Sequence, residues 1–311
     1  MIPFNNFSVI PFYTSLAQQN ANKWWIYNRV YPLFTTSSGI VPFQILVPHN
    51  TNETTVTKLT IVDCSTGYYT DISEEIGLWF EVRQFPLYGY DVVMMPFSYI
   101  LSTQNIVGRY FYEVELNGST TYVSDVITAV SDITPFLKIE WWDDDDFYMP
   151  EGIIAYKYGT GLSEQFKNVL YLPSDIAKPE YIFEEEGETR DGFFFPTKQI
   201  SEKRYRFSFF ASEYLLDVMR FIRMADHVQI TYQGHVFYPD TFLITPEWES
   251  NGDVASVDAQ FDCATVAKKI GFLGSGYTPG PTPPGPEPPD PPTPTENGDY
   301  LTSDFNGDFL V

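Results

Sequence analysis

Short apolar runs rich in β-branched and aromatic residues recur through the first 135 residues, and glycine, proline or serine separates most of them. Such residues are typical of strands, because their side chains pack well on a pleated surface. Three such stretches are Lys58 to Ile72, Gly77 to Phe85 and Tyr90 to Leu101. The pattern predicts an N-terminal β-sandwich domain over residues 1–135.

The clearest local signal is a hairpin within GRYFYEVELNGSTTYVSDVI, residues 108–127. Residues 110–115 alternate in polarity and are followed by Asn117-Gly118, a pair that favours tight turns between antiparallel strands. A further strand is predicted from Trp24 to Phe34.

The second region, residues 136–273, changes its hydrophobic period and predicts an α+β assembly domain built as a strand-helix-strands module. It opens with a strand, LKIEWW, that runs into four consecutive aspartates. Leu215, Val218, Met219 and Ile222 follow at i, i+3, i+4 and i+7, which predicts a helix with one apolar face, and Ser212 or Ala211 lies near its N-cap. The runs HVQITY, HVFYPDTFLITPEW and DVASVDAQFDC then predict antiparallel strands.

The third region has no globular pattern. Residues 274–295 hold ten of the chain's 24 prolines and predict a semi-rigid polyproline linker. Residues 296–311 are too short to fold alone, and we expect them to be a C-terminal docking peptide. Its partner-binding anchors are predicted to be the apolar residues Tyr300, Leu301, Phe305, Phe309 and Leu310.

Composition narrows the function classes. The net charge of −23 opposes contact with phosphates, so no nucleic-acid partner is expected. Aromatic residues make up 17% of the chain, and such side chains favour strands and the centres of protein interfaces. MIPFNNFSVIPFY lacks the pattern of a signal peptide, and no apolar run approaches the ~20 residues of a membrane span. We therefore expect no membrane span and synthesis in the cytoplasm.

Candidate sites for metals and cofactors are weak. Asp143, Asp144, Asp145 and Asp146 offer oxygen ligands for a cation such as Ca²⁺, but they lack the spacing of a dedicated binding loop, so a solvated loop is the preferred interpretation. His227 and His235 flank a predicted turn without a third ligand. No cofactor motif is present, and the sequence predicts no cofactor.

The remaining acidic, tryptophan and cysteine residues that could serve catalysis or binding each have a structural interpretation as well. The acidic run Glu184 to Glu186 supplies carboxylates, yet no paired arrangement around a cleft is visible, so catalysis is not expected. The pairs Trp24-Trp25 and Trp141-Trp142 could stack on sugars, although core packing or protein contact is the preferred interpretation. Cys64 and Cys263 are expected to be buried structural residues.

Two segments of the second region stand out, one from FKNVLYLPSDIAKPEYIF to RFIRMADHVQIT and the other DTFLITPEWESNGDVASVDAQFDC. Through them, residues 138–272 resemble a structural protein of tailed phages and prophages of Bacteroidetes-type bacteria. The ending LTSDFNGDFLV is similar to endings of such proteins. It implies a non-enzymatic virion component, a tail or baseplate ring subunit that binds itself and other virion proteins. A capsid or neck protein and a carbohydrate-binding β-sandwich module stay open as alternatives.

Overall fold

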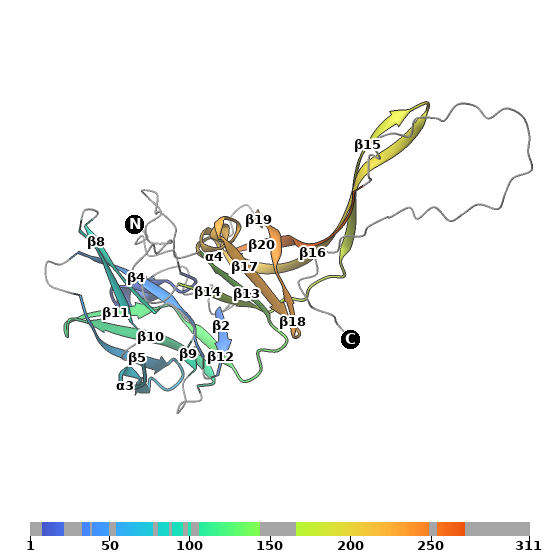
Figure 1. Cartoon of the computed structure of the whole chain (residues 1–311). Helices are drawn as coiled ribbons and strands as arrows, with labels where there is room; N and C mark the ends of the chain where they lie inside the picture. The colour runs from blue at the N-terminus through green and yellow to red at the C-terminus, as the bar shows by residue number, and fades with distance from the viewer. Residues whose placement is uncertain are drawn as a thin grey trace, which may run out of the picture. The chain divides into compact units, whose positions relative to one another are not determined.

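The structure is a computed structural model that describes residues 8–21, 33–37, 39–49, 54–76, 80–86, 89–95, 99–100, 106–143, 166–248 and 254–270 (Figure 1). The described chain is mainly β, as the sequence predicts. It divides into two compact units. Unit 1 comprises Met1–Lys178 and Tyr205–Phe261, and unit 2 comprises Pro179–Arg204 and Asp262–Val311. The predicted domain boundaries at residues 135 and 273 stay a prediction.

The largest sheet of unit 1 is built around one central strand, β10. It has seven strands, namely β1 (Phe12–Tyr13), β2 (Leu33–Thr36), β5 (Val56–Asp63), β6 (Tyr69–Asp71), β10 (Gly108–Leu116), β11 (Thr120–Ser124) and β12 (Ile127–Val130). Strand β5 pairs with one side of β10, while β11 and β12 pair with different parts of β10. Only the β12–β2 pairing of this sheet is parallel among the described strands.

The predicted hairpin at Asn117-Gly118 is confirmed. Both residues have positive φ, 53° and 66°, and the Ser119 N–H donates to the Leu116 carbonyl over 3.1 Å. This geometry matches the right-handed twist of the flanking strands, which is why asparagine and glycine are favoured there. The Asn117 side chain also accepts a hydrogen bond from the Thr55 N–H, at 2.8 Å.

Three further sheets lie entirely within unit 1. The first orders β4 (Phe43–Pro48), β8 (Tyr90–Met95) and β7 (Glu81–Phe85), and the second pairs β3 (Gly39–Ile40) with β9 (Tyr99–Ile100). The third orders β14 (Asn168–Leu172), β13 (Leu137–Trp142), β17 (His227–Tyr232) and β18 (His235–Phe237). Two short helices, α1 (Leu16–Ala21) and α3 (Ser73–Ile76), lie in the N-terminal part.

Aromatic side chains join the β4 sheet to the β10 sheet. Phe43 is fully buried, and its ring lies 4.9 Å from that of Phe12 and 5.6 Å from that of Tyr112. Burying each such ring removes a large apolar surface from water and is a main source of stability. The hydroxyl groups of Tyr110 and Tyr112 lie 3.2 Å apart, and burial raises the pKa of both.

The predicted amphipathic helix is confirmed as α4 (Glu213–Met219), which continues as the 3₁₀ helix η2 (Arg220–Met224). Ser212 is the N-cap, and its hydroxyl accepts from the Leu215 N–H. The four residues of the predicted apolar face are buried, and they are Leu215, Val218, Met219 and Ile222. The Tyr214 hydroxyl donates to the Ser8 carbonyl, so α4 contacts the N-terminal segment as well.

The last sheet orders β15 (Glu180–Arg190), β16 (Phe193–Ser212), β20 (Val254–Ile270) and β19 (Pro239–Trp248). The boundary between the two units falls within β16 and within β20. In unit 1, Phe207 packs 6.3 Å from Phe242 and 6.3 Å from Phe261, ring centre to ring centre. The predicted run HVFYPDTFLITPEW forms two strands, because β18 pairs with β17 whereas β19 belongs to the β20 sheet.

One cysteine differs from the expectation. Cys263 is buried, whereas Cys64 is exposed because it follows the end of β5 and opens the turn to β6. The Asp63 carboxylate organises that turn by accepting hydrogen bonds from the Ser65 and Thr66 N–H groups. Among the described residues, no helix has the length and apolar character needed to cross a membrane.

Candidate interaction surface

A long β-hairpin dominates unit 2, and we call residues 180–204 the arm. It consists of β15, the turn at Asp191-Gly192 and the first part of β16 (Figure 1). The two strands pair antiparallel from Glu180↔Arg204 at its base to Arg190↔Phe193 at its tip.

A tight turn joins the two strands of the arm, and a bulge interrupts their pairing. Asp191 and Gly192 have φ of 51° and 83°, the conformation of a two-residue hairpin loop. The ladder shifts register between Glu186 and Gly187, and there the Thr197 hydroxyl donates to the Glu186 carbonyl at 3.0 Å. A bulge of this kind bends a hairpin and raises its twist.

Polar contacts connect the strands of unit 2. Lys198 Nζ lies 3.3 Å from Glu186 Oε1, and Gln199 Nε2 donates to Glu185 Oε1 at 2.8 Å. Both contacts are exposed to solvent, so their contribution is small. Arg204 makes a bidentate pair with Asp262 of β20, at 2.7 and 2.9 Å. This hydrogen bonding to Asp262 raises the pKa of Arg204.

Large aromatic side chains on the arm face solvent. Tyr181 is 60% exposed, Phe183 is 71% exposed, Phe193 is 70% exposed and Phe194 is 50% exposed. Tyr181 and Phe183 alternate along β15, so both lie on the same face of the hairpin. A single exposed apolar residue is ordinary, but a group of four within one hairpin is typical of a surface that another molecule covers.

The arm also concentrates negative charge at an edge of its sheet. The sequence of β15, EYIFEEEGETR, contains five glutamates and one arginine. Strand β15 is one of the two terminal strands of its sheet, the other being β19, and β16 is its neighbour there. The arm therefore combines exposed aromatic rings, an acidic strand and a sheet edge.

The predicted acidic run Glu184 to Glu186 lies on this strand, where its side chains are exposed. The sequence pattern indicates only a charged run at this position and does not predict the hairpin. Asp191-Gly192 is the signal that could have indicated the turn, as Asn117-Gly118 did for the other hairpin.

The four aspartates predicted as a weak cation site are described only at their start. Asp143 Oδ1 accepts a hydrogen bond from the Asp226 N–H at 3.1 Å, while Asp144, Asp145 and Asp146 lie outside the described residues. Within the described ranges, no group of three or more His, Cys, Asp or Glu side chains could hold a metal ion.

The described tryptophan pair does not form an open stacking platform. Trp141 is fully buried. The Trp142 ring stacks on His227 with centres 5.3 Å apart, and Lys167 Nζ lies 4.2 Å from the Trp142 ring centre. The prediction of core packing is therefore confirmed for Trp141. Trp24 and Trp25 lie outside the described residues.

The structure separates His227 from His235. Tyr232 pairs with His235 across the turn, so His227 lies five residues further along β17, or about 16 Å at strand geometry. His49 has a different role, since its Nδ1 lies 2.7 Å from Oδ1 of the buried Asp91. Thr54 donates to the other Asp91 oxygen at 2.8 Å, so each oxygen of this buried carboxylate has a hydrogen-bond partner.

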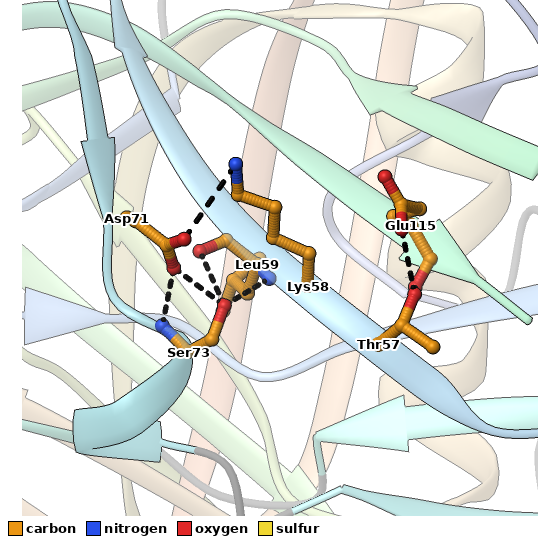
Figure 2. Close-up of polar contacts among 6 residues, drawn as sticks. All are labelled: Thr57, Lys58, Leu59, Asp71, Ser73 and Glu115. Atoms are coloured by element: carbon orange, nitrogen blue, oxygen red, sulfur yellow. Dashed lines mark hydrogen bonds and ion pairs between the residues drawn. The ribbon is translucent and has the colours of Figure 1, made fainter. Parts of the chain in front are cut away.

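A second polar surface lies on β5 and its neighbours in unit 1. Figure 2 shows the Lys58 ammonium directed at Asp71, at 3.5 Å, and the Ser73 hydroxyl between Asp71 and the Leu59 backbone. The Ser73 hydrogen bond lowers the pKa of Asp71. Thr57 and Glu115 form a separate contact at 2.9 Å. The Ser73 contacts anchor the start of α3 to β5, and the Thr57–Glu115 contact joins β5 to β10, so both have a structural role.

The predicted C-terminal anchors, Tyr300, Leu301, Phe305, Phe309 and Leu310, lie outside the described residues. No protein-family model, curated protein or solved structure matches the chain. Function is therefore inferred from the residues of the chain itself.

Proposed function

We propose that the chain is a non-enzymatic structural subunit of a tailed-phage virion that acts through protein–protein contacts. The observation that carries this proposal is the group of exposed aromatic rings on the arm, Tyr181, Phe183, Phe193 and Phe194. Aromatic side chains dominate the binding energy of protein interfaces when a partner covers them. A hairpin also holds them with little loss of conformational freedom on binding.

The resemblance of residues 138–272 to phage structural proteins supports the proposal that the chain is part of a phage particle. A tail or baseplate ring is the position we propose, with capsid or neck as the alternative. The chain would be made in the cytoplasm of the host bacterium and would function in the virion. Its partners would be further copies of itself in a ring and other virion proteins.

The proposed layout is an N-terminal β-sandwich over residues 1–135 and an α+β assembly domain over residues 136–273. The contact of Phe43 with Tyr112 supports the sandwich, because it joins two sheets face to face. The helix α4 between β16 and β17 supports the second domain. The proline-rich linker would give the C-terminal docking peptide its reach.

Carbohydrate binding is a second candidate function, and one observation favours it. Tyr68 and Tyr69 in the β5–β6 turn region are 71% and 60% exposed, and tyrosine rings can stack on sugar rings. The burial of Trp141 removes one ring of the described tryptophan pair from such a role.

Light scattering on the full-length protein, across about two decades of concentration, tests the proposal. A virion ring subunit is expected to give a discrete oligomer whose mass stays constant over most of the series. A monomer at every concentration, together with a fluorescence change on adding a glycan panel, would reject the assembly function in favour of carbohydrate binding.

A further inference from the structure

Strand β15 forms an edge that can accept another strand. It is 11 residues long and terminates the order β15-β16-β20-β19, so among the described strands it pairs with β16 alone. The backbone N–H and C=O groups on the other side of an edge strand are available for pairing with another chain. Natural proteins protect such edges from wrong partners by keeping them short or by placing charged side chains on them, and β15 is long but carries charge.

We propose that this edge of β15 binds a basic strand of a different virion protein by β-strand addition. The inference rests on the proposed structural function and names the chemistry of one partner. In such a complex, backbone hydrogen bonds supply affinity and the alternating side chains supply selectivity.

The glutamates of β15 define the charge of the partner. Within the run, Glu184 pairs across the ladder with Ile200 and Glu185 contacts the neutral Gln199, while Glu186 has one exposed cationic neighbour, Lys198, at 3.3 Å. Opposite charges on directly facing positions of neighbouring strands are stabilising, whereas like charges are destabilising. Lysine or arginine on an added strand would therefore complement the acidic run.

The same charges argue against the two partners that this chain could supply. Two copies of β15 paired antiparallel would bring their glutamates together, and the whole chain carries a net charge of −23. The peptide ENGDYLTSDFNGDFLV, residues 296–311, contains aspartate and glutamate but no lysine or arginine. Like-charge contacts of this kind select against wrong partners.

The aromatic side chains define the second requirement. Tyr181 and Phe183 lie on one face of β15, 60% and 71% exposed. An added strand with apolar residues at alternate positions would cover these rings, while its lysines on the other face would meet Glu184 and Glu186. The partner strand is thus expected to alternate apolar and basic residues.

Fluorescence anisotropy with the full-length protein and three labelled peptides tests the inference. The probes are an 11-residue peptide of alternating lysine and valine, a lysine-matched peptide with two valines replaced by proline, and a glutamate–valine peptide. We expect the lysine–valine peptide to bind, the proline peptide to bind at least tenfold more weakly, and the glutamate–valine peptide not to bind. Binding should also slow amide hydrogen exchange in residues 180–190.

Charge variants provide the matched comparison. The double change Glu184→Lys and Glu186→Lys should weaken lysine–valine binding at least tenfold, because it removes the complementary charge. The pair Glu74→Lys and Glu247→Lys makes the same charge change on exposed residues of unit 1 and should alter binding less than threefold. Equal effects of the two pairs, or equal binding of the proline peptide, would mean general electrostatic attraction and overturn the inference.

The failure of this inference can be told apart from failure of the proposed function. A discrete oligomer that does not bind the lysine–valine peptide would refute the strand partner alone. A monomer that binds the peptide at β15 but does not assemble would refute the ring subunit alone.

Discussion

Individual carboxylates in this acidic chain are held by hydroxyl and backbone donors as well as by cations. Asp71 accepts from the Ser73 hydroxyl at 2.5 Å and from the Ser73 N–H at 3.0 Å, and Lys58 adds an exposed ion pair. The Ser73 hydroxyl is the largest cause of the lowered pKa of Asp71. A group whose native pKa is depressed stabilises the fold above its unfolded pKa, and this stabilisation is lost as the pH falls through the native pKa.

Replacing Ser73 with alanine should raise the pKa of Asp71 towards its ordinary value of about 3.9. The carboxyl resonance of Asp71, followed by NMR from pH 7 to pH 2, measures this change. Thr57→Val is the control, because the Thr57 hydroxyl donates to Glu115 of β10 and not to Asp71. An Asp71 pKa that moves equally in both variants would contradict the assigned cause.

At the scale of elements, the hairpin turns depend on glycine at positive φ. Gly118 and Gly192 have φ of 66° and 83°, and a Cβ at either position would meet no atom within 4 Å. Alanine at these sites therefore introduces backbone strain without a steric clash. The two glycines form a matched pair, one in the β10–β11 turn of unit 1 and the other at the tip of the arm.

Gly118→Ala should lower the free energy of unfolding of unit 1 by about 1–2 kcal/mol, the cost of an L-residue in this conformation. Gly192→Ala should instead raise hydrogen exchange within the arm and leave exchange in β10 unchanged. Hydrogen exchange measured by mass spectrometry separates the two effects. Faster exchange of β10 amides in Gly192→Ala would mean that the arm and unit 1 unfold together.

The elements also show where the sequence predicts structure and where it does not. Strand β10 alternates buried and half-buried positions from Tyr112 to Leu116, and α4 buries its predicted apolar stripe, so the residues of both elements carry a clear period. No described side chain of β15 is buried, and its exposed glutamates and aromatic rings do not alternate regularly, so no period indicated the strand. Cys64 illustrates the same limit, because the turn geometry at Asp63 decides its exposure.

On the scale of the whole molecule, the described core ends before the proline-rich linker. The buried side chains lie between Ser8 and Cys263, and the described strands end at Ile270. A truncation after Gly276 should therefore leave the melting temperature within about 2 °C of the full-length value, because no described core contact is removed. The same truncation should weaken assembly, since it removes the predicted docking peptide.

Thermal melting measures the stability of the truncated protein, and light scattering measures its assembly. A large drop in melting temperature would show that residues beyond 276 contribute to the fold. Unchanged assembly would reject the docking role of Tyr300, Leu301, Phe305, Phe309 and Leu310.

The central claim is that the chain is a structural component of a virion, and the protein content of the particles tests it most directly. Tailed particles induced from a strain that encodes the chain would be purified on a density gradient, and quantitative mass spectrometry would give its copy number per particle. The account predicts the chain at a constant copy number that matches a symmetric ring and co-purifies with infectious particles. Absence of the chain from purified particles, while it accumulates in the same cells, would contradict the account.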